Sequence, residues 1–261
     1  MPKVFLTGDS TVSDYDLSNT DLNFLYPRNG YGMWINRYFK GSVYIKNLAL
    51  PGRSSLSFIS EDNYRILKSE IKEGDYLVVA FSHNDEKYLD DKRFTFGAGD
   101  LNDPESFKYH LYNYYIKLAG SVGAHAVLCT PIVRRSPENV YTGDRIHSIG
   151  EVTSSGVKYP PSDYPEAIRE LAEKFDLPLV DMTEATKKLY SDLGADKNVT
   201  FHATTSEKQS DTDNTHLNSY GAAVIARVFA TELKKTKSDL KNYLLEDFYT
   251  PVFSDLYVNK I

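Results

Sequence analysis

Tyr76-Leu77-Val78-Val79-Ala80-Phe81 is the longest unbroken apolar run in this chain of 261 residues. A strand without a polar face is expected to be covered on both faces, as in the middle of a parallel sheet. Four more runs are rich in Val, Ile, Leu or aromatic residues: residues 4–6, 43–50, 124–132 and 177–182. The sequence therefore predicts five strands, most of them buried on both sides.

Segments with apolar residues at helical spacing lie between and after these strands: residues 31–39, 55–71, 103–122, 164–175 and 217–233. Asp103 is expected to cap the third of them, with Pro104 at its first helical position. Alternation of strands and helices predicts an open parallel sheet with helices on both faces, an α/β fold of three layers. We expect a single domain over residues 1–261, in which residues 247–261 form an aromatic-rich tail that packs back on the domain or contacts a partner.

Composition excludes several classes of protein. The chain has 30 Lys and Arg against 36 Asp and Glu, a formal charge of -6, and no basic cluster, which disfavours a nucleic-acid partner. Cys129 is the only cysteine, so no disulfide can form within the chain. The longest apolar run falls far short of the roughly 20 residues of a membrane span. No signal peptide is visible before the first strand, which predicts a cytoplasmic protein without membrane association.

Three long irregular segments are predicted at residues 14–30, 86–103 and 133–162. Such lengths are unusual in compact domains and are typical either of binding surfaces or of plain surface insertions. They contain Tyr15, Tyr26, Tyr88, Phe94 and Phe96, whose rings could stack on a sugar, although most aromatic residues serve packing.

Common ligand motifs are missing. Gly30-Tyr31-Gly32 and Gly97-Ala98-Gly99 lack the third glycine of a dinucleotide site, and no Gly-Lys pair of a phosphate-binding loop occurs. Neither His-Glu-x-x-His nor Cys-x-x-Cys is present, so the sequence announces no zinc site. Val12 replaces the second glycine of the Gly-x-Ser-x-Gly elbow.

A serine, a histidine and an aspartate are nevertheless placed for nucleophilic catalysis. Ser10 follows the first strand, at the sheet edge where open α/β proteins bind ligands. His216, at the entrance to the last predicted helix, is a suitable base for it, and Asp213 could orient the imidazole. Each feature alone is more often a turn or a surface histidine. We expect Asp9 to shape the turn before Ser10 through bonds to the backbone.

Two further blocks follow the second and third strands. Gly52, in Leu50-Pro51-Gly52-Arg53-Ser54, could offer an unobstructed backbone N–H to a developing oxyanion. Asn84, in Ser82-His83-Asn84-Asp85, could offer a side-chain N–H. All four blocks fall on the same predicted rim of the sheet, which favours a site over four unrelated turns.

In this order Ser10, Gly52, Asn84 and His216, with Asp213 three positions before the histidine, resemble the blocks of the SGNH (GDSL-type) hydrolases. The surrounding residues are similar to the rhamnogalacturonan acetylesterase branch, carbohydrate esterase family 12, as is the run 130–135. One departure is Ser82, where that branch usually has glycine. The added side chain could narrow the site or shift the turn at Asn84.

The resemblance implies an SGNH-type, flavodoxin-like fold and an acyl-enzyme mechanism with Ser10, Asp213 and His216 as the catalytic triad. The N–H groups of Ser10 and Gly52 and the Asn84 amide would form the oxyanion hole. No metal and no organic cofactor are implied. The substrate would be a small acetylated oligosaccharide derived from pectin. The oligomeric state is not implied.

Four further residues are candidates for substrate binding. Arg53, Arg134 and Arg135 could pair with the carboxylate of an acidic sugar such as galacturonate, or simply serve solubility. His83 could contact substrate or be an ordinary buried rim residue.

Three alternatives remain open at this point. A two-metal phosphoesterase would need an Asp-x-His near the first strand, and none occurs in the chain. A lipase or thioesterase of the same fold would need an apolar acyl pocket, which the polar loops disfavour. A non-catalytic carbohydrate-binding protein is disfavoured by the presence of Ser10, Asp213 and His216 together.

Overall fold

A computed structural model describes residues 1–16 and 24–254. Its centre is a five-stranded sheet in the order β2-β1-β3-β4-β9, and all neighbouring strands are parallel. The strands are β1 Lys3–Gly8, β2 Tyr44–Asn47, β3 Tyr76–Ala80, β4 His125–Cys129 and β9 Leu179–Val180. The five predicted strands and the α/β class are confirmed, with β9 much shorter than expected.

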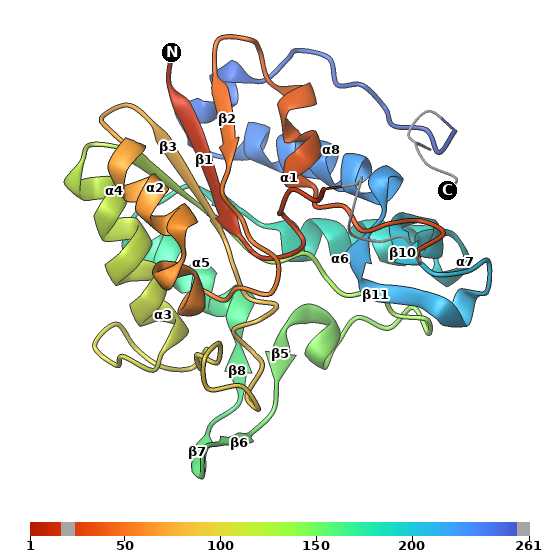
Figure 1. The fold of residues 1–261 in the computed structure, drawn as a ribbon, viewed down its shortest axis with the longest axis horizontal. Helices are drawn as coiled ribbons and strands as arrows, with labels where there is room; N and C mark the ends of the chain where they lie inside the picture. Colours follow the sequence, from red (N-terminus) through yellow and green to blue (C-terminus); the bar gives the residue numbers. More distant parts are fainter. Residues whose placement is uncertain (17–23, 255–261) are drawn as a thin grey trace.

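Helices cover both faces of this sheet, as Figure 1 shows. The described helices are α1 Gly32–Ile35, α2 Asp62–Glu70, α3 Phe107–His110, α4 Lys117–Ser121, α5 Tyr164–Lys174, α6 Met182–Leu193, α7 Ala195–Asn198 and α8 Ser219–Lys235. Between α3 and α4 the chain continues as one π-helical segment, Leu111–Ile116. Short 3₁₀ turns occupy Asn36–Tyr38, Ser57–Ser60, Gly143–Ile146, Val199–Phe201, Gln209–Asp211 and Asp239–Tyr243.

Alternate residues of the strands enter two separate hydrophobic cores. Val78 of β3 belongs to the core shared with α1, α6 and α8, whereas Leu77 and Val79 belong to the core shared with α2 to α5. Both sets are almost completely buried. The polar-free sequence of β3 is therefore explained by helices on each side, as the unbroken run predicted.

Three predicted boundaries are wrong. Ser106, rather than Asp103, caps α3, because its hydroxyl accepts the N–H of Tyr109 at 3.0 Å. The last helix begins at Ser219 and not at Leu217, which ends a strand. The fifth strand ends at Val180 and not at Met182, and helix α6, which follows it, was not predicted.

Small antiparallel sheets stand outside the central one. They are formed by β5 Ser148–Ile149 with β8 Ser162–Asp163, by β6 Val152–Ser154 with β7 Val157–Tyr159, and by β10 His202–Thr204 with β11 Thr212–Leu217. The first two pairs lie in the long segment expected to be irregular, and Figure 1 shows β6 and β7 projecting from the body. Of the predicted tail, Phe253 contacts the rings of Tyr26 and Tyr220 edge-on, and residues 255–261 lie outside the described residues.

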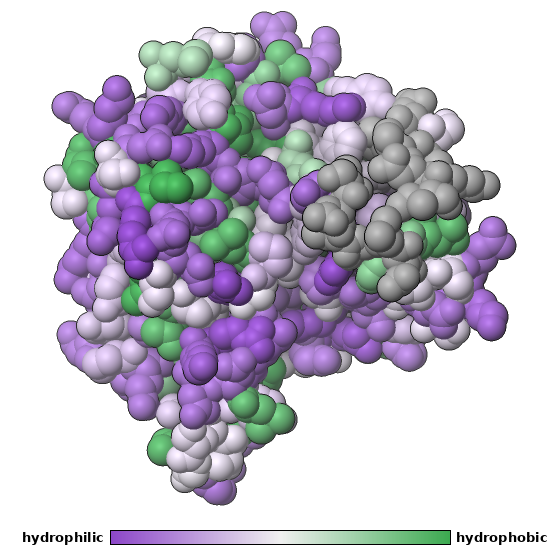
Figure 2. All heavy atoms as spheres, viewed as in Figure 1, coloured by the Kyte–Doolittle hydropathy of each residue, from purple (hydrophilic) through white to green (hydrophobic). Residues whose placement is uncertain are grey.

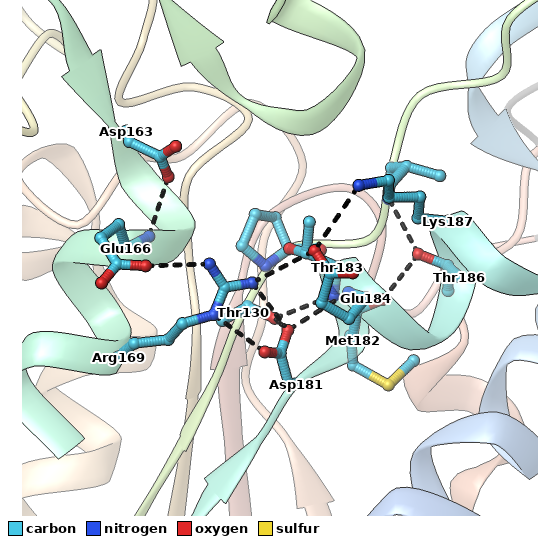
Figure 3. Close-up of polar contacts among 12 residues, drawn as sticks. Thr130, Asp163, Glu166, Arg169, Asp181, Met182, Thr183, Glu184, Thr186 and Lys187 are labelled. Carbon is cyan, nitrogen blue, oxygen red and sulfur yellow. Dashed lines mark hydrogen bonds and ion pairs between the residues drawn. The ribbon is translucent and has the colours of Figure 1, made fainter. Parts of the chain in front are cut away.

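A polar network fixes how the chain leaves β4 (Figure 3). Arg169 of α5 donates to the Asp181 carboxylate at 2.9 Å from Nε, and Thr130 donates to the same carboxylate at 2.9 Å. Asp181 also caps α6 by accepting the N–H of Glu184 at 3.2 Å. Thr130 in turn accepts the N–H of Thr183 at 2.9 Å. The end of β4 and the start of α6 are thereby joined, and the segment after β4 is directed toward the rim of the sheet.

The face in Figure 2 is mainly hydrophilic, with hydrophobic residues in small separate groups. No helix within residues 1–16 and 24–254 is long and apolar enough to cross a membrane.

Candidate active site

Ser10 lies in a tight turn at the carboxyl end of β1. Oδ1 of Asp9 accepts the backbone N–H of Thr11 at 2.9 Å and its hydroxyl at 2.8 Å, so Asp9 shapes this turn as the sequence predicted. Gly8 is required just before it, because a Cβ there would lie 2.6 Å from the carbonyl oxygen of Ala80 on β3. The Ser10 side chain therefore leaves the sheet at a fixed point of its rim.

His216 and Asp213 complete a chain of hydrogen bonds that begins at Ser10. Oγ of Ser10 lies 3.0 Å from Nε2 of His216, and Nδ1 of His216 lies 2.7 Å from Oδ2 of Asp213. Since an ionised carboxylate only accepts, the imidazole proton is assigned to Nδ1, which leaves Nε2 free to accept the serine proton. The two residues lie on β11, a strand that the sequence analysis did not predict.

The Asp213 carboxylate is strongly held in its ionised form. Burial raises its pKa, but hydrogen bonding to His216 and the charge of that imidazole outweigh burial and lower the pKa below its usual range. Oδ1 accepts the backbone N–H groups of Thr215 at 2.7 Å and His216 at 2.9 Å. The carboxylate is thus an acceptor on both oxygens and fixes the orientation of the imidazole.

A second histidine supports the strand behind His216. The fully buried His202 approaches the His216 carbonyl oxygen with Nδ1 at 3.1 Å and accepts the Tyr190 hydroxyl at Nε2 at 3.0 Å. Burial lowers the pKa of His202 to about 3, so it is neutral, with one donor and one acceptor that match these partners. The sequence analysis missed His202, which carries no motif.

Gly52 and Asn84 lie in the segments that follow β2 and β3. Gly52 has a φ of 74°, a left-handed conformation that favours glycine. Nδ2 of Asn84 donates to the carbonyl of Arg53 at 3.1 Å, which joins the two blocks directly. Within the described part of the chain no hydrogen bond engages the backbone N–H of Ser10 or of Gly52. Both are therefore available to an anionic oxygen.

The residue after Asn84 is a buried carboxyl that the sequence analysis did not single out. Oδ1 of Asp85 accepts the Ser55 N–H at 3.0 Å, the Ser55 hydroxyl at 2.5 Å and the Thr95 hydroxyl at 2.9 Å. Burial raises the pKa of Asp85 to about 8, because its effect is larger than that of these hydrogen bonds, which lower the pKa. Asp85 connects the turn at Asn84 with the segments that follow β2 and β3.

In residues 1–16 and 24–254 no group of three or more His, Cys, Asp or Glu side chains is placed to hold a metal ion. The described geometry instead offers a nucleophile, a base with its orienting carboxylate, and hydrogen-bond donors. Those are the parts that acyl transfer requires.

Comparison with known proteins agrees with this geometry. No family model matches the sequence. Over 249 residues the chain is 30% identical to the rhamnogalacturonan acetylesterase RhgT of Bacillus subtilis, covering 93% of this chain and 94% of RhgT. The chain belongs to the rhamnogalacturonan acetylesterases of the SGNH hydrolase family. It is therefore a carboxylic ester hydrolase.

Two more similarities place this SGNH hydrolase. It is 25% identical to the probable rhamnogalacturonan acetylesterase YesY of Bacillus subtilis, over 94% of this chain and 98% of YesY. Among solved structures, a catalytic mutant of the acetylxylan esterase Axe2 from Geobacillus stearothermophilus matches with a TM-score of 0.55 at 14% identity, over 89% of this chain and 94% of Axe2. At that identity the structural likeness concerns the fold.

Ser82, which departs from the family's usual glycine, is fully buried. Its carbonyl accepts the N–H of Asp85 at 2.9 Å, and its hydroxyl has no hydrogen-bond partner among the described residues. The side chain therefore has no surface with which to narrow the site of this SGNH hydrolase.

His83 is also buried, and neither ring nitrogen has a partner in the described part of the chain. Its ring lies edge-on to that of His147, with 4.3 Å between the ring centres. Burial lowers the pKa of His83 well below its ordinary value, so its imidazole is neutral.

The three arginines predicted to bind substrate differ in exposure. Arg53 is the most exposed, with 39% of its side chain accessible and an ion pair of 2.6 Å to Glu61. Arg134 is ion-paired with Glu86, and that carboxylate also lies 3.1 Å from Nδ1 of His147. The two contacts of Glu86 connect the loop after β3 with the segment after β4.

Arg135 was expected at the surface, where it could pair with a sugar carboxylate, but it is buried. It is 1% exposed, and its guanidinium donates to Asn198 at 3.1 Å and to Asn214 at 3.0 Å. A side chain so enclosed has no surface for a sugar carboxylate, so Arg135 supports β11 from behind instead of contacting substrate.

The aromatic residues of the loops are also partly packing residues. Phe94 and Phe96 contact the ring of Tyr159 at 5.1 and 5.0 Å between ring centres and are both buried. They anchor the loop after β3 against the β6–β7 hairpin.

Proposed function

We propose that this protein removes acetyl groups from pectin-derived rhamnogalacturonan oligosaccharides through an acyl-enzyme on Ser10. The observation that carries the proposal is the continuous hydrogen-bonded chain from Ser10 through His216 to Asp213. The full-length similarity to rhamnogalacturonan acetylesterases supports the choice of substrate.

In the first half-reaction His216 Nε2 takes the Ser10 proton while Ser10 Oγ attacks the carbonyl carbon of the acetyl ester. Asp213 stabilises the resulting imidazolium. The N–H groups of Ser10 and Gly52 and the Asn84 amide donate to the oxyanion. Collapse of this intermediate breaks the bond to the sugar oxygen, which takes the proton from His216.

In the second half-reaction His216 deprotonates a water molecule that attacks the acetyl-Ser10 ester. The same donors hold the second oxyanion, and its collapse releases acetate and returns the proton to Ser10. Loss of one oxyanion donor typically costs about 2.7–4 kcal/mol in the barrier.

For the acidic sugar, we propose that Arg53 is the substrate-facing cation, because it is the most exposed of the three candidate arginines. Arg134 and His83 border the same rim and are proposed to shape it. An acyl chain longer than acetyl would need an apolar pocket, and the loops around the rim are polar.

The test is hydrolysis of p-nitrophenyl esters from acetyl to dodecanoyl, followed by acetate release from acetylated rhamnogalacturonan and xylan oligosaccharides. Activity confined to acetyl, higher on rhamnogalacturonan and lost in Ser10→Ala, is expected. Preference for long chains would make the protein a lipase or thioesterase of the same fold. Full activity in Ser10→Ala would overturn the mechanism, and an inactive wild type would favour a carbohydrate-binding protein.

A further inference from the structure

The Asn84 side-chain amide is held at both ends. Its Nδ2 donates to the Arg53 carbonyl at 3.1 Å, and its Oδ1 accepts from Nη1 of Arg93 at 3.3 Å. An amide nitrogen has two hydrogens. One is used by Arg53, which leaves the other for an anionic oxygen.

Arg93 is itself fixed in place. Its Nε and Nη2 donate to Oδ2 of Asp90 at 2.7 and 2.6 Å, and its backbone N–H donates to the Asp90 carbonyl at 2.9 Å. About a quarter of the Arg93 side chain is exposed, at 28%. Nη1 also lies 4.0 Å from where a Cβ would stand on Gly52. Arg93 thus borders both Gly52 and Asn84.

The chemistry of Arg93 distinguishes the two orientations of the amide. A guanidinium only donates hydrogen bonds, so it can bond to the amide oxygen Oδ1 but not to the amide NH₂ group, which also donates. A rotated amide would also turn Oδ1 toward the Arg53 carbonyl, where two acceptors repel. Both contacts therefore favour the orientation in which the amide nitrogen is the donor to an oxyanion.

We propose that Arg93 is a positioning residue of the oxyanion hole, which locks the Asn84 amide with its N–H toward the reacting ester and polarises that N–H. The inference rests on the proposed function of Asn84. It assigns Arg93 a role in the chemical step and not in recognition of an acidic sugar, since its contact is with Asn84.

The first test uses a neutral substrate, p-nitrophenyl acetate, which has no carboxylate for an arginine to bind. Arg93→Ala is expected to lower kcat by about 10- to 100-fold with little change in KM, which is less than complete loss of an oxyanion donor. Arg93→Lys is expected to recover part of kcat, because an ammonium still donates to Oδ1. Unchanged kcat, or a change in KM alone, would overturn the proposal.

A double-mutant cycle with Asn84→Ala shows whether Arg93 acts through the amide. In the Asn84→Ala background the Arg93→Ala change is expected to have almost no further effect on kcat. An equal loss in both backgrounds would mean that Arg93 acts elsewhere and would overturn the assignment.

Arg65→Ala is the matched control. Arg65 forms an ion pair with Asp62 three residues before it, as Arg93 does with Asp90, but on the exposed surface of α2. This variant is expected to keep the wild-type kcat.

A crystal structure of Arg93→Ala gives a result independent of activity. The Asn84 amide is expected to rotate or to occupy two orientations, and an unchanged amide would overturn the proposal. If the wild type proves inactive toward esters, the proposed function fails, while this structure still tests what Arg93 does to Asn84.

Discussion

The backbone N–H of Arg135 donates to the carbonyl of Asn214 at 2.7 Å, and the guanidinium of Arg135 donates to the Asn214 side chain at 3.0 Å. Asn214 directly follows Asp213 on β11. The segment after β4 is thereby fastened to the strand that carries Asp213 and His216. We therefore expect the positions of both side chains to depend on this buried arginine.

Arg135→Ala is expected to destabilise the protein by about 2–4 kcal/mol, because Asn198 and Asn214 would lose buried hydrogen-bond partners. A shift of β11 would also lower kcat. Urea unfolding and p-nitrophenyl acetate kinetics measure the two effects. Stability within about 0.5 kcal/mol of wild type, the range of ordinary surface changes, would contradict the structural role.

Asp213→Asn is expected to lower kcat by about 10²–10⁴-fold at constant KM, as in other serine triads. An amide facing Nδ1 of His216 would favour the tautomer with a proton on Nε2, which cannot accept from Ser10. The loss should remain smaller than in Ser10→Ala or His216→Ala. Activity near that of wild type would show that Asp213 does not orient the base.

The raised pKa of Asp85 leads us to expect that the protein loses stability as the pH rises. The pKa of the Asp85 carboxyl is about 8 in the folded state and about 4 in the unfolded chain. Between these two pH values, Asp85 holds a proton in the folded state that it has lost in the unfolded state. Its contribution to the free energy of unfolding therefore falls as pH rises from about 4 to 8, by at most about 1.4 kcal/mol per pH unit, and then levels off.

Asp85→Asn keeps an oxygen for the donors of Ser55 and Thr95 and removes the titration. Relative to wild type, the variant should gain stability steadily between pH 5 and pH 8, measured by urea unfolding at each pH. Parallel curves for the two proteins would show that Asp85 does not take up a proton on folding.

Ser82→Ala is expected to stabilise the protein by about 1 kcal/mol, since it removes a buried hydroxyl without a described partner. Ser82→Gly should gain less, because glycine adds freedom to the unfolded chain. Thermal unfolding compares the three proteins, and kcat should change little. A loss of stability in Ser82→Ala would mean that the hydroxyl is hydrogen-bonded after all.

The sequence was most informative where chemistry and backbone conformation restrict a position to one residue type. Unbroken apolar runs located the central strands. Ser10, Gly52 and Asn84 stood out after predicted strands, and His216 stood out before the last predicted helix. The strand Thr212–Leu217 escaped prediction, because its residues are mostly polar and half-buried and show no period of two.

Supporting residues were harder to find. Arg93 contacts Asn84, nine positions before it, and His202 contacts His216, 14 positions after it, and neither belongs to a recognisable motif. Arg135 was predicted at the surface because arginines are rarely buried without a charged partner. Only the fold shows that two asparagines and a backbone carbonyl receive its donors.

Ser10 and His216 are separated by 206 positions in the chain. At about 5–20 residues per second, a ribosome would release the histidine roughly 10–40 s after the serine. Ser10 would therefore lack its base until the ribosome has synthesised the chain through α8 and strands β10 and β11 have paired. Hydrolysis would thus begin only after both residues have been made and brought together, and recovery of activity after denaturation would be a stringent measure of refolding across residues 10–216.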